Sequence, residues 1–111
     1  GRVLLAARDP ADARARILAG KPRALTPHTV TDPDRLAEIL TGVRAQGYCI
    51  VDQELELGLI SIAMPLVNAR GEVVAAFNLS GQVQRSSAAE MAERFLPSMR
   101  QLQMLLRPMI S

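Results

Sequence analysis

Two apolar runs without a charged residue, Leu59–Val67 and Val73–Ser80, lie near the middle of the chain. The four residues between them, 68–71, begin with Asn and end with Gly, which are turn-forming residues. This pattern predicts a β-hairpin in which Val67 lies opposite Glu72. Side chains alternate along a strand, so one face of the hairpin would then be entirely apolar and buried in the core. The pairs expected on that face are Leu66–Val73, Met64–Ala75, Ile62–Phe77 and Ile60–Leu79.

The opposite face of the hairpin carries short side chains and no charge. The same register places Ser61 opposite Asn78 and Leu59 opposite Ser80. A solvent-facing sheet would normally carry Lys, Glu, Arg or Thr, so we expect this face to be covered, with its polar groups hydrogen-bonded. Two interpretations are open. The face is either the wall of a small-molecule pocket with a few convergent polar groups, or a surface packed under a helix.

Helices are predicted on both sides of the hairpin. The segments 9–20 and 32–47 each begin with Asp-Pro, an N-cap before a proline at the first helical position, and each end with Gly. Residues 2–7 have the character of a helix end. The segment 87–106 begins with a capping box, and Pro97 should kink this helix. Its apolar face is expected to contain Met91, Phe95, Met99, Leu102 and Leu106.

The remaining segments connect these elements. Residues 21–30 contain two prolines and are expected to be extended, at most an edge strand, whereas 48–51 should form a short buried strand. An acidic loop, 52–58, leads into the hairpin, and Glu54 is a candidate for a buried hydrogen-bonding anchor at the pocket edge. Together these elements predict an α+β fold, an antiparallel sheet flanked by helices, in one domain spanning residues 1–111.

Composition excludes several classes of protein. The 111 residues are 49% hydrophobic and 22% charged, with a net charge of +2 and scattered arginines, which is not typical of a nucleic-acid surface. No apolar run approaches the roughly 20 residues of a membrane span. The single Cys49 excludes an internal disulfide and fits a reducing compartment, so we expect a cytoplasmic location. The chain has no initiator Met and is expected to be cut from a longer protein.

Candidate catalytic and metal-binding residues are few. His28, the only histidine, has no nucleophile or orienting carboxylate in a recognisable motif, and it is far in sequence from Cys49. Ser61 and Ser80 lack the G-x-S-x-G context of a nucleophile. We therefore expect neither an enzyme nor a cofactor or metal site.

A series of short motifs resembles the effector-binding domain of IclR-family transcriptional regulators, in order and over nearly the whole chain. The Asp-Gln-Glu-Leu-Glu-Leu-Gly run together with Asn78 resembles the branch that regulates aromatic-acid catabolism, although Ile60 stands where that branch commonly has arginine. The matching segments are 1–6, 25–29, 31–33, 44–48, 52–59 and 70–81.

The resemblance implies a partial GAF-like domain that senses a small acidic metabolite. It also implies an N-terminal winged helix-turn-helix that binds DNA, absent from this chain, and assembly into dimers or tetramers. The family's pocket positions fall on Ser61, Asn78 and Ser80, and Gly1 would lie at the edge of a further contact. Leu59 and Glu54 are further candidates for effector binding. An anionic effector would then be held by these hydroxyl and amide groups and by backbone donors near Gly1, with no lysine or arginine aimed at it. A GAF-like ligand module of a signalling protein and a purely oligomerising domain are the alternatives.

Overall fold

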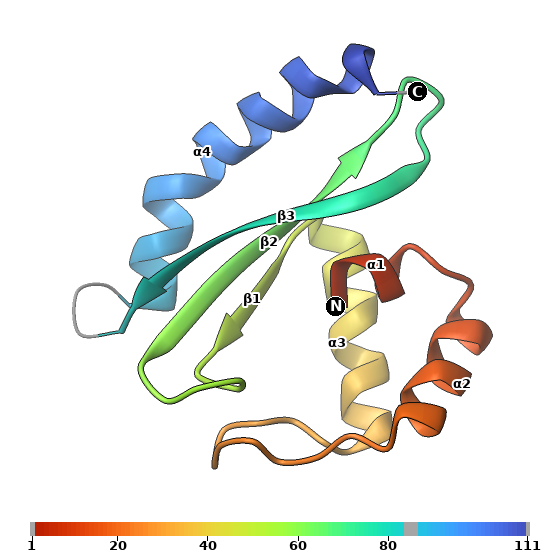
Figure 1. The fold of residues 1–111 in the computed structure, drawn as a ribbon, viewed down its shortest axis with the longest axis vertical. Helices are drawn as coiled ribbons and strands as arrows, with labels where there is room; N and C mark the ends of the chain where they lie inside the picture. Colours follow the sequence, from red (N-terminus) through yellow and green to blue (C-terminus); the bar gives the residue numbers. More distant parts are fainter. Residues whose placement is uncertain (1, 84–86, 111) are drawn as a thin grey trace.

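The two uncharged runs form the centre and one edge of a three-stranded antiparallel sheet (Figure 1). The computed structural model describes residues 2–83 and 87–110. In it β1 (Cys49–Asp52) pairs with β2 (Leu59–Val67), and β2 pairs with β3 (Val73–Gln82). The predicted hairpin and the short strand after residue 48 are thus confirmed, as is the α+β class.

The predicted register of the hairpin is wrong by two residues. Val67 pairs with Val73, so the turn holds one residue more than expected, and an irregularity between Leu66 and Val67 adds another. The longer turn is organised by Asn68, whose Oδ1 accepts hydrogen bonds from the backbone N–H groups of Arg70 (3.0 Å) and Glu72 (2.9 Å). A shift of two leaves every side chain on its expected face, because the strand repeat is two residues. The observed pairs are Leu66–Ala75, Met64–Phe77, Ile62–Leu79, Ile60–Gly81, Leu59–Gln82 and Ser61–Ser80.

One face of the sheet is covered by α4 (Ala88–Leu106), which is followed by the 3-10 turn η1 (Arg107–Met109). Beneath α4 lie Ile60, Ile62 and Met64, each at most 1% exposed. Gly81 sits at a close approach of the two layers, since a Cβ there would lie 3.2 Å from Cε of Met91. Alanine at position 81 would therefore require the end of the Met91 side chain to shift by a few tenths of an ångström.

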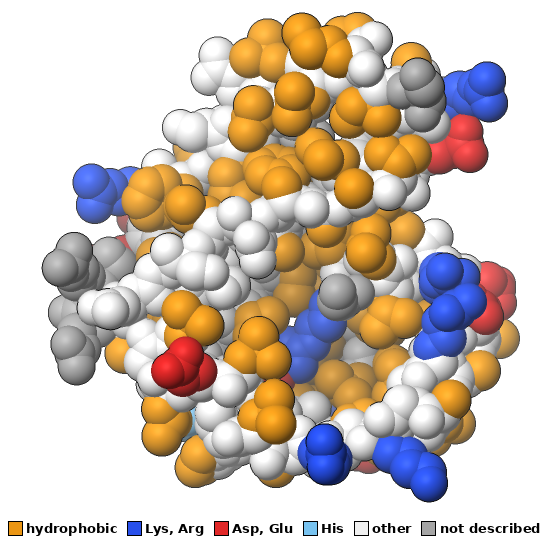
Figure 2. Space-filling model, in the orientation of Figure 1, with side chains coloured by type: hydrophobic (Ala, Val, Ile, Leu, Met, Phe, Trp, Pro, Cys, Tyr) orange, Lys and Arg blue, Asp and Glu red, His pale blue; other side chains and the backbone are white. Residues whose placement is uncertain are grey.

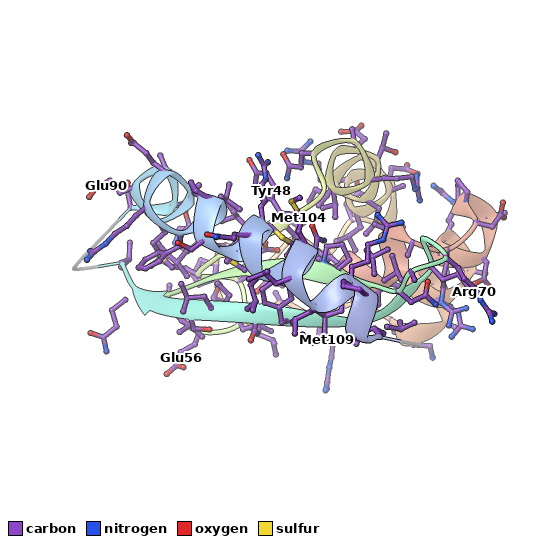
Figure 3. The ribbon with its side chains drawn as sticks, turned by 90° about the horizontal axis from the view of Figure 1, so that it is seen from above. Tyr48, Glu56, Arg70, Glu90, Met104 and Met109 are labelled. Carbon is purple, nitrogen blue, oxygen red and sulfur yellow. The ribbon has the colours of Figure 1, made fainter. Side chains whose placement is uncertain are left out.

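The helix α4 is confirmed in extent but not in its whole apolar face. Ser87 caps it as predicted, accepting a hydrogen bond from the Glu90 N–H (3.2 Å), and the helix continues through Pro97. Figures 1 and 3 both show its ribbon changing direction along its length. Met99 is buried, but Leu102 is 44% exposed, so the predicted apolar face is wrong at Leu102.

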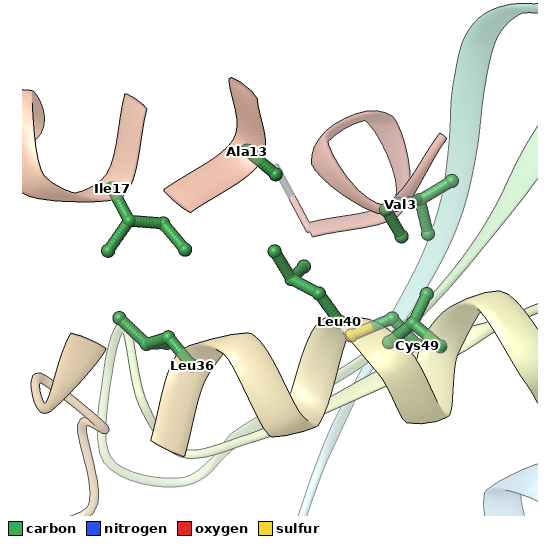
Figure 4. Packing of buried hydrophobic residues seen from close by; sticks show 8 residues of the cluster. Val3, Ala13, Ile17, Leu36, Leu40 and Cys49 are labelled. Atoms are coloured by element: carbon green, nitrogen blue, oxygen red, sulfur yellow. The ribbon is translucent and has the colours of Figure 1, made fainter. Parts of the chain in front are cut away.

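The other layer consists of α1 (Arg2–Ala6), α2 (Pro10–Gly20) and α3 (Pro33–Gln46). Both Asp-Pro starts are confirmed: the Asp9 and Asp32 side chains accept from backbone N–H groups of the first turns of α2 and α3. Gly47 ends α3 with φ of 84°, a left-handed conformation that glycine adopts without strain. Figure 4 shows the core of this layer, in which Ile17, Leu36 and Leu40 meet Val3, Ala13 and Cys49.

The segment 21–30 forms no strand, and residues 25–28 within it form a bend and a turn where an extended connection was expected. Its backbone donors are used locally: the Thr29 N–H bonds to the Thr26 carbonyl, and the Leu25 and Thr26 N–H groups bond to the Thr29 hydroxyl. The Val30 N–H donates to Glu54 Oε1 at 3.0 Å. These four N–H groups are therefore not available to pair with a neighbouring strand.

Among the described residues, no helix is long and apolar enough to cross a membrane.

Candidate functional site

A cavity of about 390 Å³ lies against the sheet face opposite α4. It is lined by α1, by β1, by the loop after β1 and by the β2–β3 hairpin, and its wall is apolar apart from Arg2, Cys49, Ser61 and Asn78. Figure 2 shows a hollow on this side of the molecule in which a basic group lies below the surrounding apolar side chains. Volume and composition match those of small-molecule binding sites, which are concave and mostly apolar with a few polar groups.

The cavity exists because the strand positions that face it carry small side chains. Ala63 pairs with Asn78, and Ser61 and Ala76 lie on the same face. Longer residues at these positions would fill the space between the sheet and α1. The neighbouring positions of β2 face the other way, into the core under α4, so the hollow does not weaken that core.

The structure brings together some of the predicted site residues and separates others. Ser61 and Asn78 line the cavity. Ser80 does not, but its hydroxyl lies 2.9 Å from that of Ser61, a hydrogen bond that the corrected register explains. Leu59 lines a different depression, beside Gly58 and Gln82. Gly1 lies outside the described residues.

The expectation that this sheet face is covered is wrong for the described residues taken alone. Asn78 and Ser80 are exposed, and Ser61 is half-buried. Ile60, where the resembled branch commonly has arginine, is fully buried on the opposite face, so this departure does not change the cavity wall. Whether Ser61, Asn78, Ser80, Leu59 and Glu54 contact an effector stays a prediction.

Arg2, which is part of the cavity wall, forms an ion pair with Glu54. Arg2 Nη1 donates to Glu54 Oε2 at 2.6 Å, and Nη2 donates to Oε1, which also accepts the Val30 N–H at 3.0 Å. The two side chains are 17% and 12% exposed. Arg2 is one of the residues that line the cavity, whereas Glu54 is not. The expectation that no arginine is aimed at the site is therefore wrong. No pattern in the sequence indicated this contact, since its partners are 52 residues apart.

Burial and pairing act against each other on the pKa values of this cluster. Burial works to raise the pKa of Glu54, but the hydrogen bonds from Arg2 and Val30 and the attraction of Arg2 together lower it. The hydrogen bond to Glu54 raises the pKa of Arg2. Burial raises the pKa of the nearby Cys49 thiol, against the attraction of Arg2. At neutral pH the pair is charged and the thiol is protonated, so Cys49 is a poor nucleophile.

The arrangement is suited to binding a ligand. Within the part of the chain that the structure describes, no three His, Cys, Asp or Glu side chains are grouped to hold a metal ion. His28 is exposed and does not line the cavity. A polar amide, a hydroxyl and a guanidinium around an apolar space can orient a small molecule that has both an apolar body and polar ends.

Comparisons with known proteins agree on one family. The family model described as the C-terminal domain of the bacterial transcriptional regulator IclR matches residues 1–104. The chain is 47% identical over 97 residues to the Pca regulon regulatory protein of Pseudomonas putida, covering 87% of this chain and 33% of that protein. It is 41% identical over 78 residues to the p-hydroxybenzoate hydroxylase transcriptional activator of Acinetobacter baylyi, covering 70% and 29%. The chain thus spans about a third of the length of these curated relatives.

Comparison with a solved structure supports the same family assignment. That structure is a double mutant of the inducer-binding domain of the PobR transcription factor from Acinetobacter, in complex with 3-hydroxybenzoic acid. The TM-score is 0.94 at 35% sequence identity, and the match covers 98% of this chain and 62% of that one. The chain therefore belongs to the family of IclR C-terminal domains of bacterial transcriptional regulators, as the order of its motifs predicted.

Proposed function

We propose that this chain is the effector-sensing part of a DNA-binding transcriptional regulator and binds a small aromatic or keto acid. The observation that carries the proposal is the 390 Å³ cavity with Ser61, Asn78 and Arg2 in its wall. It is supported by the likeness to the PobR domain, whose structure contains 3-hydroxybenzoic acid. Family membership favours a regulator over a ligand module of a signalling protein.

The apolar and polar parts of the wall would bind different parts of such a ligand. An aromatic ring would pack against Val51, Leu55 and Ala63, while Ser61 and Asn78 would hydrogen-bond its polar substituents. Buried hydrogen bonds of this kind contribute about 0.5–1.5 kcal/mol each, and more when one partner is charged.

Binding would also connect separate parts of the fold. The cavity wall comes from α1, from the loop after β1 and from the sheet, so a ligand would contact all three at once. A ligand that fits one relative placement of these parts better than another shifts the protein towards it. We propose that this shift is what the regulator transmits to its DNA-binding domain.

The direct test is a titration of the full-length protein with 3-hydroxybenzoate, followed by isothermal titration calorimetry. Asn78→Leu replaces the amide with an apolar side chain of similar size, and the affinity should fall about tenfold or more. Gln82→Leu also replaces an amide with leucine on β3, but outside the cavity, and should bind the ligand like the wild type. Ser80→Ala measures how much the Ser80 hydroxyl contributes to the affinity. Equal affinity in the wild type and Asn78→Leu would remove Asn78 from the site, and no binding of aromatic or keto acids would refute the proposal.

We also propose that the protein functions as a homodimer or tetramer in the cytoplasm. The proposed assembly is supported by apolar side chains on the C-terminal half of α4 and on η1 that the described residues leave uncovered. Met104 and Met109 are marked in Figure 3. Leu105 and Met109 are 60% and 78% exposed. In sedimentation velocity, Leu105→Glu should shift the full-length protein towards smaller species, because association would bury the new charge. An unchanged sedimentation coefficient, or a monomeric wild type, would exclude this surface.

A further inference from the structure

The cavity contains one side chain with a full charge, and that charge is positive. Of the described residues in its wall, only Arg2 is Lys, Arg, Asp or Glu, and the balancing carboxylate of Glu54 is not part of the wall. A ligand in the cavity would therefore contact Arg2 but not Glu54, the carboxylate that pairs with it. The local field favours an anionic group over a neutral one.

Arg2 also retains hydrogen-bonding capacity for a ligand. A guanidinium carries five N–H donors, of which Glu54 takes one from Nη1 and one from Nη2. The remaining three, on Nε and on the second positions of Nη1 and Nη2, make at most a weak interaction with Cys49 in the described part of the chain. Planar N–H donors of this kind match the two oxygens of a carboxylate.

Glu54 fixes the direction of these donors. Its two oxygens hold both terminal nitrogens of Arg2, and its position is in turn set by the Val30 N–H and by its own backbone carbonyl, which accepts from the Thr29 hydroxyl. Both side chains are largely buried, so the pair loses little to solvent screening. Glu54 is thus a positioning residue, and Arg2 is presented to the cavity before any ligand arrives.

We propose that Arg2 binds the carboxylate of the effector and makes the cavity select an acid over the corresponding neutral amide. The inference rests on the proposed function of the same cavity and adds the group that determines its ligand class. Asn78 and Ser61 then hydrogen-bond the opposite, uncharged end of the ligand. The guanidinium thereby makes the cavity bind organic acids more tightly than alcohols or amides of the same shape.

The experiment compares 3-hydroxybenzoate with 3-hydroxybenzamide by calorimetry on the full-length protein. The wild type should prefer the acid by about tenfold or more, since hydrogen bonds between charged groups are about twice as strong as neutral ones. Arg2→Gln should lower the affinity for the acid about tenfold to a hundredfold and leave that for the amide unchanged. Arg2→Lys, which keeps the charge but not the planar donors, should restore part of the preference.

Two further variants separate this role from a structural one. Arg14→Gln removes an arginine that pairs with Asp34 at 2.6 Å on the exposed surface and should keep the wild-type preference. Arg2→Gln combined with Glu54→Gln leaves no unpaired carboxylate, so it tests selectivity even where the single variant folds poorly.

Each result has a defined meaning. Retention of the wild-type preference by the double variant, or by folded Arg2→Gln, overturns the role of Arg2. Equal binding of acid and amide by the wild type does the same but leaves the proposed function standing. Absence of binding of either compound to the wild type overturns both proposals.

Discussion

Replacing Ile62 with alanine should lower the free energy of unfolding by about 3–5 kcal/mol. Ile62 is fully buried in the central strand β2, among Met91, Leu96 and Met99 of α4. Large-to-small changes at such positions lose the transfer free energy of the deleted carbons and leave a cavity that the neighbours fill only partly. Because the sheet and α4 form this core together, neither can collapse onto the space without moving the other.

Urea unfolding followed by circular dichroism measures the effect, with the slope of the transition used to confirm that the compactness of the two states is unchanged. Leu79→Ala is the matched control, since it removes the same number of carbons from the residue that pairs directly with Ile62. Leu79 is 36% exposed, so its loss should cost clearly less. Equal losses at the two positions would contradict the placement of the core.

Replacing Glu54 with alanine should destabilise the protein by about 2–4 kcal/mol at neutral pH. The change leaves the largely buried Arg2 guanidinium and the Val30 N–H without their acceptor. Removing one partner of a buried ion pair is costly because the other charge stays in a poorly solvated place. Glu54→Gln keeps an oxygen for Val30 and loses only the charge, so its effect should be smaller.

The Arg2–Glu54 ion pair predicts that the free energy of unfolding depends on pH. The pKa of Glu54 in the folded state is lowered from its ordinary value of 4.5, so folding is favoured by the charged form. This contribution is complete above the ordinary value and is lost as the pH falls through the lower, folded-state pKa. The difference in unfolding free energy between wild type and Glu54→Gln should therefore shrink below pH 4.5. A difference that is constant down to acid pH would mean that the carboxylate is not paired in solution.

Local signals in the sequence were sufficient for most elements of the fold. Asp32 before Pro33 and Gly47 in the left-handed region define α3, because caps act within one helical turn. The alternation along β2 and β3 predicted which side chains lie under α4, and it did so even with the wrong register, since a shift of two preserves the faces.

Features that depend on distant contacts were not predictable in the same way. The register depends on how Asn68 folds the turn, which adds residues that no apolar pattern counts. The hydrogen bond between Ser61 and Ser80 follows from that register. The proposed role of Arg2 depends on a partner 52 residues away and on the direction in which the five-residue helix α1 faces. Neither can be predicted from a periodic pattern in the sequence.

The alternation of β2 has a consequence for how this domain could diversify. Ser61 and Ala63 face the cavity, while Ile60, Ile62 and Met64 between and beside them hold the core under α4. The cavity wall and the core under α4 thus draw on alternate residues of one short strand. A substitution at Ser61 can therefore change the cavity wall without removing a side chain from the packing under the helix.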